Sequence, residues 1–445
     1  MTARFAIRGW EAKGDEIAFS YHCDRFGAFT EALTFPGKAA QLSALSPGQK
    51  QLLNIAATAI GVSYYKANAC GHIVAETGFP TPAARALIEA LYVEGLGEFY
   101  VRNNLPYPPA LTLEGAIGTP APAETKTPAA RRAIVAFGGG KDSHVALSLV
   151  ERAGVEPELV SIAMSEKIRA VIADCTDRPV TFLGRKLDAN LLAANKAGAL
   201  NGHIPVTAIV SLILTFYASL TGADWVVFAN EHSADEATLQ VNGHAVNHQF
   251  SKTFGAEKLL RDAITSVLPA GPDYFSALRP AEELWIAREL SRLPQALARF
   301  RSCNRNFVIA NQERALASGR WCGKCAKCVF TAIVTAPFLT RARSKEILGA
   351  DVLNDPENRG FAEELAGFAS AKPWECVGTI GEVSAAFSKL LDNPDWADAL
   401  LVREIGARVR ERASPAALDA MFAHGLAASG ESFLPPQMRA AYEAA

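Results

Sequence analysis

Residues 133–154, AIVAFGGGKDSHVALSLVERAG, combine a short β-branched run, three consecutive glycines and a helical pattern that follows Lys-Asp-Ser. The run predicts a buried strand, and residues 143–153 predict a helix. Glycines 138–140 have no Cβ, so the turn between the two elements can bring several backbone N–H groups to one anion. The amino terminus of the helix adds its dipole at the same place. The stretch therefore predicts a phosphate-binding loop at the end of a strand.

Two better-known nucleotide-binding patterns do not fit this loop. Walker A needs Gly at position 135 and Ser or Thr after its Lys, where the chain has Val135 and Asp142. The Rossmann pattern needs Gly at position 143, where the chain has Ser143. The loop is similar to the S-G-G-x-D-S loop of the ATP pyrophosphatase (PP-loop) families, with Gly138 in the first Ser position. That similarity implies binding of the pyrophosphate part of ATP, with an ordinary glycine-rich turn as the alternative. The implied phosphate-binding residues are Gly138, Gly139, Gly140, Lys141, Asp142 and Ser143.

The alternation of strand and helix continues after the loop. Short apolar runs predict strands, and longer periodic runs predict helices. We expect strands over residues 133–137, 158–164, 180–183 and 225–230, and helices over 167–175, 187–197 and 204–220. Strands that alternate with helices form a parallel sheet with helices on its faces. The predicted fold class is therefore α/β, with a parallel sheet of the PP-loop type.

Other segments flank this predicted sheet. Near the N-terminus, alternating apolar and polar residues predict a small antiparallel sheet over residues 5–10, 16–22 and 29–35. Two helices follow, with Ser46 and Thr81 as N-caps and Pro47 and Pro82 at the first helical positions. The predicted division is an N-terminal α+β domain (1–104), a Pro- and Ala-rich linker (105–130), the ATP-binding domain (131–340) and a helical C-terminal region (341–445).

The composition argues against several classes of protein. The chain has 445 residues, 49% of them hydrophobic, and a formal net charge of −2, so two or three domains with buried cores are expected. The near-neutral charge argues against nucleic-acid binding through bulk electrostatics. The start, MTARFAIRGWEAKGDE, lacks the apolar region of a signal peptide, and the apolar window 204–220 is interrupted by Thr and Ser. We therefore expect a soluble, cytoplasmic protein that binds neither nucleic acid nor membrane.

Half of the cysteines are expected to form one metal site. Cys322, Cys325 and Cys328 lie in CGKCAKC, and Cys303 lies upstream. Four thiolates match a tetrahedral structural zinc site. An iron–sulfur cluster is the competing metal centre, and reduced buried or reactive thiols are the third alternative. The remaining cysteines are expected to be small core residues: Cys23, Cys70, Cys175 and Cys376.

Further motifs relate most of the chain to one family. They are GVSYYK (61–66), EGLGEFYVRN (94–103), GGGKDS (138–143), NGHIPVTA (201–208), VVFANE (226–231), VNHQFSK (246–252), SCNRNF (302–307), RWCGKCAKC (320–328) and KPWECVG (372–378). On these motifs the chain resembles the UDP-N-acetylmuramoyl-L-alanyl-L-glutamate epimerase family (MurL) of bacterial peptidoglycan synthesis. The resemblance implies that the terminal L-glutamate of UDP-MurNAc-L-Ala-L-Glu is inverted while ATP yields AMP and pyrophosphate. It also implies Mg²⁺ on the ATP phosphates and a functional pairing with the muramoyl ligase that adds L-glutamate.

The implied reaction accounts for an ATP loop in an epimerase. The α-proton beside an ionised carboxylate is very weakly acidic, because its removal places a second negative charge next to the first. An acyl-adenylate lacks the carboxylate charge, and its carbonyl is a better electron sink. A general base can then remove the α-proton, and an acid can return one to the opposite face.

Proton transfer and substrate binding need ionisable side chains. The candidates for proton transfer are His203, Glu231, His232, His248 and Cys303. His203 and His248 lead because they lie in motifs shared with the family, and Glu231 comes next because it follows a predicted strand at the carboxyl edge of the sheet. A structural role is the alternative for each of them.

The remaining polar candidates lie at or beyond the glycine loop. Asp142 is expected to orient Ser143 or to assist Mg²⁺, and it can also cap the helix. Lys252, Arg301 and Arg305 are candidates for the UDP diphosphate or the glutamate carboxylates, because guanidinium groups bind such anions bidentately. A solvated surface charge is the alternative for each.

Two other functions compete with epimerisation. Another PP-loop adenylating enzyme, acting on a nucleobase or a tRNA, would also suit a cysteine zinc site. A non-catalytic ATP-binding regulator would bind ATP without releasing AMP in the presence of substrate.

Overall fold

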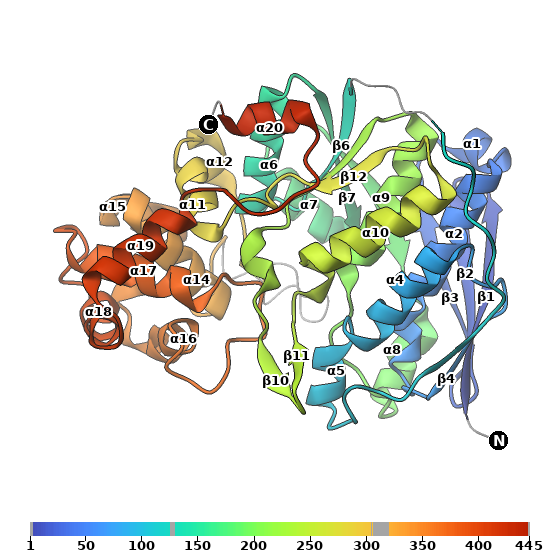
Figure 1. The fold of residues 1–445 in the computed structure, drawn as a ribbon, viewed down its shortest axis with the longest axis horizontal. Coiled ribbons are helices and arrows are strands. Elements are labelled where there is room, and N and C mark those ends of the chain that lie inside the picture. The colour runs from blue at the N-terminus through green and yellow to red at the C-terminus, as the bar shows by residue number, and fades with distance from the viewer. Residues whose placement is uncertain (1–2, 125–129, 304, 306–319, 444–445) are drawn as a thin grey trace.

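A single ten-stranded sheet runs through the computed structural model, which describes residues 3–124, 130–303, 305 and 320–443 (Figure 1). The strand order is β12-β9-β6-β7-β8-β3-β2-β1-β4-β5, and β10 and β11 form a separate hairpin. The strands are β1 (Arg4–Lys13), β2 (Glu16–Cys23), β3 (Gly27–Thr34), β4 (His72–Ala75), β5 (Thr112–Glu114), β6 (Arg132–Ala136), β7 (Glu156–Ala163), β8 (Val180–Lys186), β9 (Trp225–Phe228), β10 (Leu239–Val241), β11 (His244–Val246) and β12 (Asp273–Ser276).

The five strands from β12 to β8 are parallel to one another. The chain places β7 and β8 on one side of β6, and then returns to place β9 and β12 on the other side. The order of the strands therefore reverses between β6 and β9. In open sheets of this kind, ligands bind outside the carboxyl ends of the strands at such a switch point. The prediction of an α/β fold with a parallel sheet is confirmed for this part of the chain.

The N-terminal strands extend the same sheet. β1, β2 and β3 are antiparallel neighbours, as the alternating pattern predicts. β3 then pairs with β8 in antiparallel register, with Ala32 opposite Lys186 and Thr34 opposite Gly184. The N-terminal segment and the parallel strands therefore share one continuous sheet.

The segment predicted as a linker also contributes to the sheet. β5 lies at its edge and pairs in parallel with β4, with His72 opposite Thr112. Residues 125–129 lie outside the described part of the chain. The described remainder of residues 105–130 is thus partly ordered as an edge strand.

Helices cover both faces of the sheet. Successive residues of β6 point to opposite sides, so Ile134 joins one apolar core, whereas Ala133 and Val135 join a second. α2, α4, α9 and α10 cover the first face (Figure 1), while α6 and the C-terminal helices α11, α14 and α17 pack into the second core.

The helices up to residue 267 are α1 (Ala39–Ser43), α2 (Pro47–Ile60), α3 (Val62–Tyr65), α4 (Pro82–Val93), α5 (Gly97–Arg102), α6 (Lys141–Arg152), α7 (Glu166–Ala173), α8 (Ala189–Lys196), α9 (Val206–Thr221), η1 (His232–Asp235), η2 (Phe250–Lys252) and α10 (Phe254–Val267). Those that follow are α11 (Glu283–Ser291), α12 (Pro294–Arg299), α14 (Ala326–Thr335), η4 (Ala336–Phe338), α15 (Arg341–Leu348), η5 (Val352–Asn354), η6 (Pro356–Asn358), α16 (Arg359–Leu365), α17 (Ile380–Leu391), α18 (Leu400–Arg412), α19 (Pro415–Gly425) and α20 (Pro436–Glu443). Within the part of the chain described, no helix is both long enough and apolar enough to cross a membrane.

The predicted helix starts of the N-terminal segment are confirmed. Oγ of Ser46 accepts a hydrogen bond from the backbone N–H of Gln49, and the backbone N–H of Ser46 donates to Oε1 of Gln49. Thr81 accepts one from the backbone N–H of Ala84. Both caps place Pro at the start of the helix, where its missing N–H costs no hydrogen bond.

Candidate functional site

The glycine loop lies at the carboxyl end of β6, beside the switch point of the sheet. Gly139 has a φ of 75°, and a Cβ at this position would lie 2.6 Å from Sγ of Cys175, so glycine is required. Gly140 is the N-cap of α6, which begins at Lys141, slightly before the predicted start at residue 143. The backbone N–H of Lys141 donates to Oγ of Ser302 at 3.5 Å, so the N–H groups that follow it in the first turn of α6, together with the positive end of the helix dipole, are the ones available to an anion.

The loop side chains are engaged within the protein. Oγ of Ser143 donates to the Gly140 carbonyl oxygen at 2.9 Å. Nζ of Lys141 is fully buried and forms ion pairs with Asp142 and Glu283. The loop thus offers its backbone to a phosphate, while these side chains stabilise its conformation.

We expect Gly138→Ser to leave the stability of the protein unchanged and Gly139→Ser to lower it. A Cβ on Gly138 meets no atom within 4 Å, whereas Gly139 has a positive φ and no room for a side chain. The strained backbone alone costs about 1–3 kcal/mol at position 139. Chemical denaturation of both variants and the parent measures this difference. Equal destabilisation of the two variants would contradict the geometry of the loop.

Behind the loop lies a group of charged residues that we call the charge cluster. Its members are Lys141, Asp142, Glu231, Lys252, Glu283 and Lys327. Burial opposes ionisation of Asp142, but the nearby Lys141, Lys327 and Lys252 outweigh burial and hold the pKa of this carboxyl below its usual value. Burial, opposed by Lys141 and reinforced by Asp142 and Glu231, raises the pKa of Glu283. Opposite charges thus compensate one another in a region with little water.

Two carboxylates of the charge cluster keep free acceptor atoms. Oε2 of Glu231 and Oε1 of Glu283 are buried without a hydrogen-bond partner among the described residues. Glu231 follows β9, so it lies at the carboxyl edge of the sheet, where the sequence places it. Mg²⁺ binds in proteins through one or two carboxylates together with substrate phosphates. Glu231 and Glu283 therefore fit the donors that a phosphate-bound Mg²⁺ needs.

Arg279 connects the segments that carry these residues. Its fully buried guanidinium donates to the Glu257 carboxylate at 2.9 Å and to the Glu231 carbonyl oxygen at 2.9 Å. A third hydrogen bond goes to the Lys252 carbonyl oxygen. One side chain thus positions the backbones of Glu231 and Lys252.

The two leading histidines lie together beside Glu98. Their ring centroids are 4.4 Å apart. Nδ1 of His248 lies 2.5 Å from Oε2 of Glu98, and Nδ1 of His203 lies 3.8 Å from the same oxygen. The His203 loop is held by Lys66, which donates to Oδ1 of Asn201 at 2.5 Å.

The two imidazoles have opposite protonation preferences. Burial lowers the pKa of His203 to about 4. Burial also acts against charged His248, but the hydrogen bonds to Cys376 and Glu98 outweigh burial and raise the pKa of this ring to about 9. At neutral pH, His203 is therefore neutral and His248 carries a positive charge.

Cys376 completes this group, although the sequence analysis expects it to be a small core residue. Its side chain is partly exposed, and its backbone carbonyl oxygen accepts a hydrogen bond from Nζ of Lys327. Burial alone would raise the pKa of the thiol, but Lys252, His248 and Lys327 lower it to about 7. Lys252 and Lys327 also belong to the charge cluster, so the thiol and the glycine loop share one electrostatic environment.

The remaining predicted residues lie outside this group. The backbone N–H of Arg301 donates to the Gly139 carbonyl oxygen at 2.8 Å, while its guanidinium pairs with Asp174. Arg305 is exposed. His232 lies 3.7 Å from Asp235, and its side chain is 44% exposed. Arg301 therefore supports the loop through its backbone.

The four predicted metal-ligating cysteines come together. Their sulfur atoms lie within 4.8 Å of one another, with 3.7 Å between Cys322 and Cys328 and 3.5 Å between Cys325 and Cys328. Zn–S bonds of about 2.3 Å in a tetrahedron place sulfurs about 3.8 Å apart. The four thiols thus fit a closed tetrahedral site. Cys303, which is also a candidate for proton transfer, belongs to this group of thiols.

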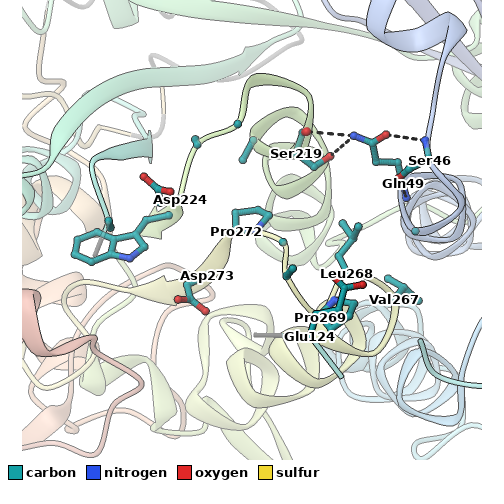
Figure 2. Close-up of a pocket in the computed structure, with 18 of the residues that line it drawn as sticks. Ser46, Gln49, Glu124, Ser219, Asp224, Val267, Leu268, Pro269, Pro272 and Asp273 are labelled. Carbon is teal, nitrogen blue, oxygen red and sulfur yellow. Dashed lines mark hydrogen bonds between the residues drawn. The ribbon is translucent and has the colours of Figure 1, made fainter. Parts of the chain in front are cut away.

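A cavity of about 760 Å³ lies on the opposite edge of the sheet (Figure 2). It is lined by Asp224 and Asp273, at the amino ends of β9 and β12, and by Gln49, which is hydrogen-bonded to Ser219. Because the glycine loop lies at the carboxyl ends of the parallel strands, this cavity is separate from the candidate site.

Sequence reasoning missed Glu98, Lys327 and Cys376 as site residues, and it also missed Glu283. The first three lie in motifs that the sequence analysis had already selected: EGLGEFYVRN, RWCGKCAKC and KPWECVG. The sequence therefore contained an indication of these three residues, because their motifs lie close in space to the motifs of His203, Glu231 and His248. Glu283 lies outside every selected motif.

Comparisons with known proteins agree with this convergence of motifs. The family models described as the MurL N-terminal domain and the MurL C-terminal domain match residues 2–277 and 299–420. A Xanthomonas oryzae protein is 34% identical over 98% of this chain and 96% of its own length. Relatives from Micromonospora and Salinispora tropica are 39% and 38% identical over 92% of this chain and over 89% and 87% of their own lengths. All three are named UDP-N-acetyl-alpha-D-muramoyl-L-alanyl-L-glutamate epimerase. The chain belongs to the MurL family.

Proposed function

We propose that this protein is an ATP-dependent epimerase that inverts the terminal L-glutamate of UDP-MurNAc-L-Ala-L-Glu through an acyl-adenylate, releasing AMP and pyrophosphate. The names of the three relatives support the substrate and the inversion. The observation that carries the proposal is that Lys327, which with Lys252 lowers the pKa of the loop residue Asp142, also donates a hydrogen bond to the Cys376 carbonyl oxygen. An anion-binding loop and proton-handling side chains thereby face the same buried region.

The loop side of the site suits activation of the carboxylate. The backbone of residues 138–143 and the start of α6 would bind the pyrophosphate part of ATP. Lys252 and Lys327 would stabilise negative charge on the α-phosphate and on the carboxylate that attacks it. Mg²⁺, held by Glu231 and Glu283 with the phosphates, would neutralise charge on the leaving pyrophosphate.

The histidine side of the site suits proton transfer. Glu98 fixes the orientation of His248 through Nδ1, which leaves Nε2 for exchange of a proton. His203 and His248 lie close enough to respond to the same ligand. Exclusion of water around these groups would protect the acyl-adenylate from early hydrolysis.

We also propose a structural zinc ion on Cys303, Cys322, Cys325 and Cys328. Cys303 follows the segment in which Arg301 supports Gly139, and Oγ of Ser302 lies 3.5 Å from the Lys141 backbone nitrogen. Cys328 lies on α14, which also carries Lys327. The ion would therefore link two segments of the chain. One contains Arg301 and Ser302, which contact the glycine loop, and the other is α14, which carries Lys327.

The function is tested by incubating the protein with ATP, Mg²⁺ and UDP-MurNAc-L-Ala-L-Glu. We expect AMP to form, together with D-glutamate after acid hydrolysis of the product. Inversion without AMP would contradict the ATP-dependent mechanism. AMP formation only with a nucleobase or RNA would favour another adenylating enzyme, and ATP binding without turnover would favour a regulator.

A further inference from the structure

Glu98, His203 and His248 bring three metal-ligating side chains together, and we call them the histidine–carboxylate triad. One ligand atom from each lies within 4.8 Å of the other two. Oε2 of Glu98 is 2.5 Å from Nδ1 of His248 and 3.8 Å from Nδ1 of His203. Zinc bonds of about 2.0–2.2 Å to nitrogen and oxygen in a tetrahedron place the ligand atoms about 3.4 Å apart. The two separations fall on either side of this value, so small side-chain movements would let the three atoms share one ion.

The carboxylate of the triad has one oxygen available to an ion. Its other oxygen, Oε1, accepts a hydrogen bond from Arg102 at 3.1 Å, and Arg102 lies one turn further along α5. Glu98 is 4% exposed, whereas the side chains of His248 and His203 are 13% and 23% exposed. An ion can therefore enter past the imidazoles and meet the carboxylate at the inner end of the site.

Contacts outside the triad hold the two histidines in place. The backbone N–H of His248 donates to Oγ1 of Thr238 at 3.1 Å. Nδ2 of Asn103, which follows α5, donates at 3.1 Å to the carbonyl oxygen of Asn201, two residues before His203. The three ligands come from three segments of the chain that are already fixed, which lowers the conformational cost of binding an ion.

The ligand types of the triad select the kind of ion. Imidazole nitrogen is a good ligand for zinc and other transition metals, whereas Mg²⁺ prefers oxygen ligands. Two histidines and one glutamate form a known zinc ligand set that leaves the fourth position open. Lys66 and Arg102 add positive charge nearby, which weakens the attraction for a cation. The triad therefore fits an exchangeable Zn²⁺ ion, distinct from the Mg²⁺ expected on the ATP phosphates.

We propose that the histidine–carboxylate triad binds Zn²⁺ reversibly and that the bound ion blocks proton transfer by the two histidines. A neutral imidazole has one N–H and one nitrogen lone pair. With the ion on Nδ1, the N–H stays on Nε2 and the ring has no lone pair left to accept a proton. The ion would replace the proton that Nδ1 of His248 and Oε2 of Glu98 share, and this proton would pass to the solvent.

The binding of zinc does not rest on the proposed function. Only its inhibitory effect does, because that effect requires a reaction in which the histidines exchange protons. The triad is also separate from the four thiols of the proposed structural zinc ion, because the two groups share no residue.

Equilibrium dialysis of the purified protein against buffered Zn²⁺ measures binding without substrate. We expect the parent to bind one exchangeable zinc ion in addition to the zinc proposed at the four cysteines. Loss of an outer-sphere partner weakens metal binding by about 10–100-fold, so His203→Gln, which removes an imidazole, should weaken it by at least about 100-fold. Glu98→Gln, which removes the negative charge, should have an effect of the same size.

His72→Gln is the matched control for the dialysis experiment. His72 lies 2.8 Å from Glu114 and forms an imidazole–carboxylate pair, but among the described residues this pair belongs to no three-ligand group. The control should bind zinc with the affinity of the parent. A parent without an exchangeable zinc ion would overturn the proposed site, and so would triad variants that bind zinc as tightly as the parent.

A second measurement uses the parent alone and so does not depend on the folding of a variant. Dialysis first removes the exchangeable ion, and Co²⁺ is then added up to one ion per chain. Cobalt on nitrogen and oxygen ligands absorbs weakly in the visible range, whereas thiolate ligands add strong sulfur-to-cobalt charge-transfer bands in the near ultraviolet. We expect the visible bands alone. Charge-transfer bands would place the ion on thiolates and overturn the triad as its site.

The epimerase assay tests the inhibitory effect. With free Zn²⁺ fixed by a metal buffer, because ATP also binds zinc, inversion should fall in proportion to the occupancy measured by dialysis. Inversion at the full rate with the triad occupied would overturn the inhibition. If the parent inverts no substrate even without zinc, the proposed function fails, while the dialysis result still decides whether the triad binds zinc.

Discussion

Cys328→Ser should abolish binding of the proposed zinc ion and remove much of the stability of the helical region. Cys328 is fully buried on α14 and lies within 3.7 Å of two further thiols. Binding of zinc to four thiolates contributes on the order of 10 kcal/mol to the folding of small zinc domains, and the loss of one ligand opens a closed site. Metal analysis and thermal unfolding measure both effects, and we expect less than one zinc per chain and an unfolding transition at lower temperature.

Cys70→Ser is the matched control for this experiment. It makes the same chemical change at a cysteine outside the cluster, so zinc content and unfolding temperature should equal those of the parent. A parent protein that folds fully without bound metal would contradict the zinc proposal. Iron with inorganic sulfide and visible absorption would assign the four thiols to an iron–sulfur cluster.

Arg279→Met should lower the free energy of unfolding by about 3–5 kcal/mol, because it leaves the Glu257 carboxylate buried without its cation. Arg279 and Glu257 are both almost completely buried, and the guanidinium also binds the carbonyl oxygens of Glu231 and Lys252. Methionine keeps most of the volume of the side chain, so the effect reports on charge and hydrogen bonds. Chemical denaturation of the variant and the parent gives the difference.

Two further variants test the cause of this loss. Arg279→Met combined with Glu257→Gln should recover part of the stability, since the uncompensated charge is removed. Arg132→Met breaks a half-exposed ion pair with Glu158 at 3.6 Å and should cost only about 0–1 kcal/mol. A loss below 1 kcal/mol for Arg279→Met would show that the guanidinium does not stabilise the site as its contacts indicate.

Local features of the fold were predictable because their causes are local. Ser46 and Thr81 cap their helices through bonds to residues three positions ahead, and the glycine loop follows its strand directly. The pairing of β3 with β8 was not predictable, because alternation of apolar residues identifies a strand without identifying its neighbour. The ordered strand within residues 105–130 was missed because its composition is typical of a linker.

The candidate site was predictable only in part, because many of its contacts join residues that lie far apart in the sequence. His203 and His248 follow from their motifs, but Glu98 and His248 are 150 positions apart in the chain. Cys376 shows no metal-ligand spacing, so only its neighbours in space, among them Lys252 and Lys327, indicate that the pKa of its thiol is lowered. An isolated cysteine, read without its neighbours in space, gives no indication of reactivity.

The pairing of β3 with β8 affects how the enzyme can move. Backbone hydrogen bonds join the N-terminal strands to the parallel strands, so no hinge separates these two parts of the sheet. Glu98, on α5 between β4 and β5, and Lys141, at the start of α6 after β6, are therefore attached to one frame. Lys327, on α14, and Cys376, between α16 and α17, lie outside the sheet, so their positions depend on how the C-terminal segment packs against this frame. The two strand segments therefore form one rigid sheet, and the packing of the C-terminal helices determines where Lys327 and Cys376 lie relative to it.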